Sequence, residues 1–296
     1  NDLMGDSAED VWASLQEQEG QPLVNHAGAE TLPPGSIFKI ITTAAGLNNG
    51  FNPSSTLTGS NVITLPDTVT ELTNYANQKC NGQDAVTLQT AFALSCNTAF
   101  VEMSEQLGAD ELRKYAKAFG VGENYDLGVS TSAGTLGDLP DGAATAQSAI
   151  GQRDVTMTAL QAAVMAGTVA NKGTRMQPYL VNRITDAQMK DIRTTKPKKA
   201  DQAVNEETAA TLTDLMYASE RSSAGYDGNG FASKTGTAEH GEGLAPHVWY
   251  VAFDPERDIA VGVVVKNGGN LGESATGGKV SGPIGRAILR AYQGEQ

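Results

Sequence analysis

The chain has 296 residues, 40% of them hydrophobic, which is enough to bury a large core in one domain or in two subdomains. Its formal net charge of −13 argues against nucleic-acid binding, which requires a basic surface, so we expect no nucleic-acid partner. The sequence holds no apolar run long enough to span a membrane, and its first residues lack the features of a signal peptide.

The N-terminal part of the chain is predicted to hold two helices, a short one over residues 7–18 and a buried one over residues 36–50. The second begins with a Ser-x-x-Lys tetrapeptide, Ser36 to Lys39, directly after two prolines and a glycine. Side chains three positions apart share a helix face, so the Lys39 amine can reach the Ser36 hydroxyl and act as its base. An isolated match of this kind is more often a capping serine beside a solvated lysine.

The middle of the chain is predicted to be mainly helical after a stretch of loop and short strands over residues 51–86. Helices are expected over residues 87–94, 98–107, 109–119, 158–171 and 205–219, and a long glycine-rich loop over 122–153. The first two helices are separated by a break at Ser95-Cys96-Asn97, which displays side chains that a continuous helix would bury. Ser95 can relay a proton and Asn97 can hold a peptide group, although such residues are more often helix caps.

The last third of the chain is predicted to form three strands, the last two as an antiparallel hairpin, and a closing helix: residues 230–237, 247–253, 259–265 and 283–292. Lys234-Thr235-Gly236-Thr237 ends the first strand, where alternation places Lys234 and Gly236 on one face and the two threonines on the other. Gly236 lets another backbone or a ligand approach closely, and the ammonium and hydroxyl groups suit a carboxylate. The simpler alternative is an edge strand with solvated side chains.

The motifs Ser-x-x-Lys, Ser-x-Asn and Lys-Thr-Gly each occur once, in that order, and together they form the residue set of the penicillin-recognising serine acyltransferases. Over nearly its whole length the chain resembles the transpeptidase domain of class B penicillin-binding proteins, and within them the actinobacterial penicillin-binding protein A group. Further segments carry this resemblance: residues 22–27, 151–154, 158–161, 171–173 and 247–253. Cys96, at the centre of the second motif, departs from the usual pattern.

This resemblance implies an α/β (α+β) fold in which an antiparallel sheet flanked by helices meets a mostly helical subdomain, with the active site between them. It implies one transpeptidase domain over residues 1–296, with the sheet and its helices from residues 1–50 and 215–296 and the mainly helical subdomain from residues 51–214. Family members usually have two more strands, a pedestal and a membrane anchor before the equivalent of Asn1, and this chain lacks them. We therefore expect it to be part of a longer protein, anchored at the outer, extracytoplasmic face of the cytoplasmic membrane and working with other wall-synthesis or division proteins.

The resemblance also implies a D,D-transpeptidase that cross-links peptidoglycan stem peptides during growth or division and uses no metal or other cofactor. Ser36 would attack the terminal D-Ala-D-Ala peptide, Lys39 would accept its proton, and Ser95 would pass that proton to the leaving D-Ala. The amine of a second peptide would resolve the acyl-enzyme, and β-lactam antibiotics would acylate the same serine. The backbone N–H groups of Ser36 and Thr237 would form the oxyanion hole. The implied substrate-binding residues are Asn97, Lys234, Thr235, Gly236 and Thr237.

The chain has two cysteines, Cys80 and Cys96, but no Cys-x-x-Cys pair, and its three histidines are scattered, so the sequence indicates no metal site. In the oxidising setting that the resemblance implies, we expect a Cys80–Cys96 disulfide. Such a bridge would stabilise the fold by about 3 kcal/mol in the chain-entropy model and would pin the loop around Ser95 and Asn97. A buried free thiol at Cys96 is the alternative.

Four other functions share part of this pattern. A D,D-carboxypeptidase has all three motifs and differs in transferring the acyl group to water. A β-lactam-sensing receptor domain is acylated but takes no part in wall chemistry. A class A-type β-lactamase needs a Glu-x-x-Leu-Asn signature, and the nearest candidate, residues 123–128, lacks the final Asn. A nucleophilic pair of Cys96 with a histidine has no accompanying oxyanion motif.

Overall fold

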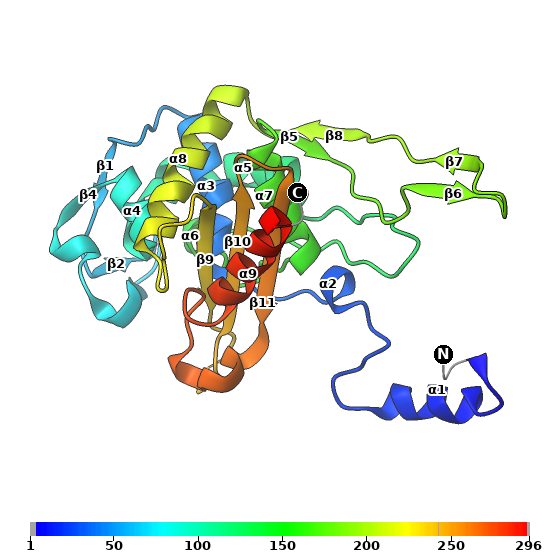
Figure 1. The fold of residues 1–296 in the computed structure, drawn as a ribbon. Coiled ribbons are helices and arrows are strands. Elements are labelled where there is room, and N and C mark those ends of the chain that lie inside the picture. Colours follow the sequence, from blue (N-terminus) through cyan, green and yellow to red (C-terminus); the bar gives the residue numbers. More distant parts are fainter. Residues whose placement is uncertain (1–3, 242, 295–296) are drawn as a thin grey trace.

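The computed structural model describes residues 4–241 and 243–294 (Figure 1). The α-helices are α1 (Ala8–Glu17), α2 (His26–Ala29), α3 (Lys39–Leu47), α4 (Leu88–Leu94), α5 (Asn97–Ala118), α6 (Gly142–Ala149), α7 (Ala159–Ala170), α8 (Glu206–Ser222) and α9 (Ser281–Gly294). Short 3-10 segments are η2 (Gly35–Phe38), η3 (Tyr75–Asn77), η4 (Cys80–Gly82) and η5 (Lys266–Ser274). The strands are β1 (Thr56–Thr58), β2 (Val62–Thr64), β3 (Glu71–Thr73), β4 (Ala85–Thr87), β5 (Thr174–Met176), β6 (Arg183–Thr185), β7 (Asp191–Thr194), β8 (Lys199–Gln202), β9 (Ala232–Ala238), β10 (His247–Asp254) and β11 (Ile259–Val265).

The last third of the chain forms the main sheet, as predicted. Its strands are antiparallel in the order β11-β10-β9, so β10 is central and β9 is an edge strand. All eight residues of β10 are buried, because helices cover both faces of the sheet. The β10–β11 pairing begins at Asp254 and Ile259 on either side of a tight turn, which is the predicted hairpin.

Helices α7 and α9 lie on opposite faces of this sheet (Figure 1). Close approach depends on glycine at two places, where a side chain would collide. A Cβ at Gly285 of α9 would lie 2.3 Å from the Tyr250 ring of β10. On the other face, a Cβ at Gly262 of β11 would lie 2.5 Å from Ala159 O of α7. The sheet is therefore sandwiched between the two helices and has little room to shift.

The helical part of the molecule is centred on α3, whose residues from Lys39 to Gly46 are all buried. This helix packs against α5 and α8, so side chains on almost all sides of it are buried. The α-helix that the sequence predicts from Ser36 begins slightly later, because residues Gly35–Phe38 form the tighter turn η2 and regular α-helix starts at Lys39.

Two features of the middle region test the sequence expectations. Gly108 has φ 75° and ψ 172°, so α5 is interrupted there as predicted. The prediction of a long loop over residues 122–153 is partly wrong, because helix α6 forms within this range. Asp141 caps α6 by accepting a hydrogen bond from Ala144 N at 2.7 Å. The sequence of α6 is rich in alanine and has a weak apolar pattern, so packing against α5 rather than periodicity stabilises it.

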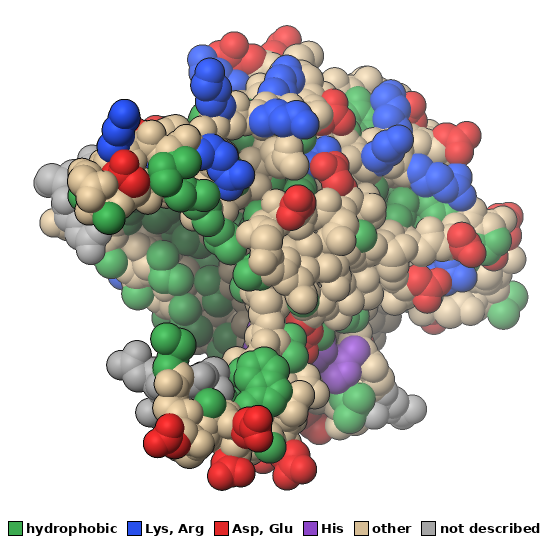
Figure 2. Space-filling model, turned by 90° about the vertical axis from the view of Figure 1, so that its right-hand side faces the viewer, with side chains coloured by type: hydrophobic (Ala, Val, Ile, Leu, Met, Phe, Trp, Pro, Cys, Tyr) green, Lys and Arg blue, Asp and Glu red, His purple; other side chains and the backbone are tan. Residues whose placement is uncertain are grey.

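Helix α1 and the β6–β7 hairpin project from the body of the molecule (Figure 1). The face on which they project has a hollow lined by hydrophobic side chains, with lysine and arginine side chains along one edge (Figure 2). Within the described residues, no helix is both long enough and apolar enough to cross a bilayer.

A disulfide joins Cys80 to Cys96, as predicted, with Cα atoms 5.7 Å apart. Both residues are buried. The bridge links η4 to Cys96, which directly precedes α5, so it restrains the break that displays Ser95 and Asn97.

Gly151 lies where the chain after α6 meets the segment before Ser36. Gly35 N donates to Gly151 O at 2.9 Å, and a Cβ at Gly151, which has φ +73°, would lie 2.1 Å from Gly35 O. Gly151→Ala should therefore destabilise the fold by about 3 kcal/mol or more, because backbone must move. Gly50→Ala is a matched control, since Gly50 also has a positive φ (+93°) but open space around it, and should cost only about 1 kcal/mol. Equal free energies of unfolding in denaturant for the two variants would contradict this prediction.

The disulfide makes a separate prediction. Alkylation of the unreduced, unfolded protein should add no mass, whereas alkylation after reduction should modify both Cys80 and Cys96. Reduction should lower the free energy of unfolding by about 3 kcal/mol, because the unfolded chain regains loop entropy. Two alkylated thiols in the unreduced protein would disprove the bridge.

Candidate active site

The segment that leads into Ser36 is fixed against the main sheet. The indole nitrogen of Trp249 on β10 donates to Pro33 O at 2.8 Å. A Cβ at Gly236 would lie 2.8 Å from Pro34 O, and a Cβ at Gly35, which has φ +53°, would lie 2.7 Å from Thr237 O. Glycine on both sides thus lets the backbone before Ser36 run directly against β9.

Lys39 lies one turn beyond Ser36, and its side chain is fully buried. Its Nζ is 3.1 Å from Ser36 Oγ and 3.3 Å from Ser95 Oγ. It also donates to Ser95 O and to Asn97 Oδ1, each at 2.7 Å, and lies 5.3 Å from the centre of the Phe100 ring. These contacts join α3 to the α4–α5 break.

The break between α4 and α5 presents Ser95 and Asn97 to Lys39. Ser95 ends α4 with φ 61° and ψ 38°, a left-handed conformation that is uncommon for a residue other than glycine. Such conformations cost free energy and occur frequently at functional sites. Asn97 begins α5, and its Nδ2 donates to Thr73 O at 3.1 Å, which ties the break to β3.

Lys234 reaches the same place from β9 and is also fully buried. Its Nζ donates to Ser95 Oγ at 2.9 Å and to Thr235 O at 3.0 Å, and lies 5.7 Å from the centre of the Phe92 ring. The Ser95 hydroxyl therefore lies within hydrogen-bond distance of two lysine amines.

The two amines have strongly perturbed acid–base properties. Burial lowers the pKa of Lys39 well below its usual value, and the nearby Lys234 ammonium lowers it further. Burial lowers the pKa of Lys234 to about 7. Repulsion between the two amines disfavours the state in which both are charged. Near neutral pH the site can therefore offer a neutral amine beside Ser36 and an ammonium beside Ser95.

The remaining motif residues line the edge of β9. Thr235 and Thr237 are half-buried, as are Ser36, Ser95 and Asn97. Among residues 4–241 and 243–294, neither the Thr235 nor the Thr237 hydroxyl forms a hydrogen bond, so both are available to a ligand oxygen. As an edge strand, β9 also leaves backbone N–H and C=O groups without a strand partner. Half-buried hydroxyls in front of fully buried amines form an arrangement suited to nucleophilic catalysis.

Sequence reasoning missed four residues that shape this site. Phe92 and Phe100 line the lysines, Thr73 anchors Asn97, and Trp249 anchors the lead-in to Ser36. The two phenylalanines flank the Ser-x-Asn break in sequence, so their position was a usable signal. Thr73 acts through its carbonyl oxygen, for which the side-chain pattern gives no signal.

Within the described residues, no group of three or more His, Cys, Asp or Glu side chains could hold a metal ion. His240 and His247 stack with ring centres 3.9 Å apart. Burial, followed by the charges of His240 and Lys266, lowers the pKa of His247 to about 4, so this ring is neutral at pH 7.

The chain is similar in sequence to known proteins. The family model of the penicillin binding protein transpeptidase domain matches residues 6–290. Peptidoglycan D,D-transpeptidase PbpA of Mycolicibacterium smegmatis is 45% identical over 291 residues, which are 95% of this chain and 59% of that protein. PbpA of Mycobacterium tuberculosis is 42% identical over 295 residues, which are 96% of this chain and 60% of that protein. The chain thus spans 59–60% of the length of these curated relatives.

Solved structures agree with the sequence relatives. The ceftriaxone acyl-enzyme complex of penicillin-binding protein A from M. tuberculosis is similar with a TM-score of 0.92 and 41% identity, covering 97% of this chain and 66% of that chain. The penicillin G acyl-enzyme complex of the same protein gives a TM-score of 0.91, 41% identity and the same coverage. The predicted fold and family are thereby confirmed, and the chain belongs to the penicillin-binding protein transpeptidase domain family.

Proposed function

We propose that the chain is the catalytic part of a peptidoglycan D,D-transpeptidase that forms an acyl-enzyme at Ser36. The observation that carries this proposal is the 3.1 Å distance between Ser36 Oγ and the Nζ of a fully buried Lys39. Membership of the family and the β-lactam acyl-enzyme complexes of a similar protein support it. Because the relatives are longer than this chain, the activity of the whole protein is part of the proposal.

The first step needs Lys39 as a neutral base. A neutral amine has two hydrogens, and the two shortest contacts of Lys39 Nζ, to Ser95 O and Asn97 Oδ1, use both of them. The lone pair of Nζ is then available to the Ser36 hydroxyl. Ser36 Oγ attacks the carbonyl carbon of the D-Ala-D-Ala peptide bond while its proton passes to Lys39 Nζ. The carbonyl oxygen becomes an oxyanion, held by the backbone N–H groups of Ser36 and Thr237.

The second step needs a proton at the leaving amine. In the proposed mechanism Ser95, which is in reach of both Lys39 and Lys234, donates its proton to the leaving D-Ala nitrogen and regains one from Lys39. The C–N bond breaks and the acyl group remains on Ser36. Lys234, Thr235 and Thr237 hold the terminal carboxylate of the substrate, and Asn97 orients the stem peptide by exchanging its present partners. An amine of a second stem peptide then attacks the ester carbonyl carbon, the C–O bond to Ser36 breaks, and a proton from the amine returns to Ser36 Oγ through Lys39.

We further propose that this chemistry takes place outside the cytoplasmic membrane, in a longer protein with an N-terminal anchor and protein partners in wall synthesis or division. A disulfide beside the catalytic break supports an oxidising compartment. β-Lactams, which acylate a similar protein, are the proposed inhibitors.

The acceptor distinguishes a transpeptidase from a D,D-carboxypeptidase or a sensing domain. A peptide ending in D-Ala-D-Ala should release D-Ala, and added amine acceptor should yield the cross-linked product. D-Ala release to water alone would favour a carboxypeptidase, and acylation by penicillin without turnover of any peptide would favour a sensor.

Ser36→Ala should abolish covalent labelling by a fluorescent penicillin, because no hydroxyl remains to form the ester. Mass spectrometry of the labelled wild-type peptide should place the adduct on Ser36. Ser54→Ala, at an exposed serine away from the site, is the control and should label as the wild type does. Labelling that persists in Ser36→Ala would sink the assignment of the nucleophile.

The rate of acylation should depend on pH through both lysines. It should rise as Lys39 loses its proton, and fall as Lys234, with a pKa of about 7, loses the charge that binds the carboxylate. Lys234→Arg should remove the fall at high pH, because the guanidinium stays protonated throughout the range. Acylation rates measured from acidic to alkaline pH test this, and a high-pH fall that survives in Lys234→Arg would belong to another group.

A further inference from the structure

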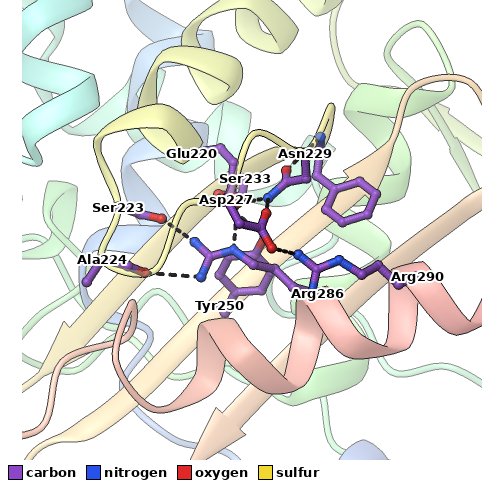
Figure 3. A network of polar contacts seen from close by, with 10 residues as sticks. Glu220, Ser223, Ala224, Asp227, Asn229, Ser233, Tyr250, Arg286 and Arg290 are labelled. Carbon is purple, nitrogen blue, oxygen red and sulfur yellow. Dashed lines mark hydrogen bonds and ion pairs between the residues drawn. The ribbon is translucent and has the colours of Figure 1, made fainter.

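A buried ionic network lies behind β9 and is not accounted for by the catalytic steps. Its centre is Glu220, near the end of α8, whose side chain is 1% exposed and pairs with the 2% exposed Arg286 of α9. Figure 3 shows Arg286 reaching from α9 toward Glu220, with Ser223 and Ala224 on its other side. We call the members of this set the Glu220 network: Glu220, Ser223, Ala224, Asp227, Asn229, Ser233, Tyr250, Arg286 and Arg290.

The two oxygens of Glu220 have different tasks. Oε1 accepts from Arg286 Nε at 2.7 Å and from Asn229 Nδ2 at 2.9 Å, which ties α8 to α9 and to the connection before β9. Oε2 accepts from the hydroxyl of Ser233 on β9 and, at 3.0 Å, from the hydroxyl of Tyr250 on β10. Burial raises the pKa of Glu220, but the hydrogen bonds from Arg286, Ser233 and Asn229 outweigh it and leave the pKa below its usual value. The carboxylate is therefore ionised at neutral pH and holds four donors.

Ser233 directly precedes Lys234. Successive side chains of a strand point to opposite faces, so Ser233 meets Glu220 on one face of β9 while Lys234 meets Ser95 on the other. A shift of β9 that broke one of these contacts would also displace the other. The position of Lys234 Nζ is thus linked to the contact between Ser233 and Glu220.

The contact between Ser233 and Glu220 matters for the position of Lys234 because β9 is an edge strand. Within the described sheet, β9 pairs with β10 alone, whereas β10 pairs on both sides. An edge strand has a ladder partner on one side only, so contacts from its faces, such as that of Ser233 with Glu220, add to what holds it in place. The carboxylate oxygen that accepts from Ser233 also accepts from Tyr250, but Tyr250 belongs to the central strand, which is already paired on both sides.

Stability alone is a poor explanation for such a network. A buried ion pair costs desolvation free energy, and apolar residues of the same volume often serve the fold as well. A charged centre with four donors fixes geometry more sharply than apolar packing does.

We propose, on the basis of the function proposed above, that Glu220 is a positioning residue for acylation, acting through Ser233 to keep Lys234 in hydrogen-bond distance of Ser95. Substitution of Glu220 itself does not test this cleanly, because it leaves the Arg286 guanidinium buried without its partner. Ser233→Ala removes the single contact in question and leaves the ion pair in place.

The experiment compares Ser233→Ala with Tyr250→Phe. Each substitution removes one of the two hydroxyl groups that donate a hydrogen bond to Glu220 Oε2. Ser233→Ala should lower the second-order rate constant of Ser36 acylation by fluorescent penicillin roughly tenfold, because small displacements of catalytic groups are costly. The fall in rate at high pH should also move to higher pH, since a less enclosed Lys234 regains a more ordinary pKa. Tyr250→Phe should leave the rate and the pH profile as in the wild type, because β10 is held on both sides.

If the network only stabilises the fold, the variants should give a different result. If Ser233→Ala acylates within about twofold of the wild type with an unchanged pH profile, or if Tyr250→Phe loses as much activity, the proposal is overturned. Thermal unfolding of both variants checks the fold, and Ser233→Cys, which keeps a weak donor, repeats the comparison should the alanine variant unfold. Its rate should lie below the wild type and its pH profile should move in the same direction, and a wild-type rate and profile would overturn the proposal.

Labelling of the wild-type protein distinguishes failure of the proposed function from failure of the positioning role of Glu220. If wild-type protein is not labelled at Ser36, the proposed function fails and the positioning role fails with it. If the wild type is labelled and Ser233→Ala behaves identically, the proposed function stands and the positioning role alone is rejected.

Discussion

The burial of two lysine amines around one serine hydroxyl is the constraint on which the rest of the structure depends. A charged amine loses hydration free energy when buried, so both lysines are surrounded by oxygen acceptors, and their pKa values are lowered. That loss is what makes Lys39 a candidate base at neutral pH. The amines of Lys39 and Lys234 can meet at Ser95 only if α3, the α4–α5 break and β9 are brought together and kept there.

Each of these three segments is held from behind by a different device. The backbone before Ser36 lies against β9 where Gly35 and Gly236 leave no side chain in the way. The α4–α5 break is held by the Cys96 disulfide and by the contact of Asn97 with β3. The rear face of β9 meets the Glu220 carboxylate through Ser233. The three segments are thus held in place in three ways: by close backbone packing at glycine, by a disulfide and by a buried carboxylate. In each case the restraint fixes the position of a side chain of the site.

Prediction from the sequence worked where the signal was local. The three-residue spacing of Ser36 and Lys39 is a helical repeat, and the hairpin before Val265 follows from strand-forming residues around a tight turn. It failed at Gly142–Ala149 within the expected loop, because α6 is stabilised by its contact with α5 rather than by its own pattern. It also gave no hint of Thr73, which contributes a backbone carbonyl, or of the role of Glu220, whose partners come from four other segments.

The sequence by itself determined which chemical groups are present, the order of the three motifs and the family to which they point. The tertiary structure decided which of these groups meet: Lys39 reaches Ser95 across 56 positions and Lys234 reaches it across 139. It also decided the pKa values, because burial and the neighbouring charge are properties of the assembled site. The physical reason is that helix and strand periodicities are set by a few adjacent residues, whereas long-range contact and desolvation arise only when distant segments pack together.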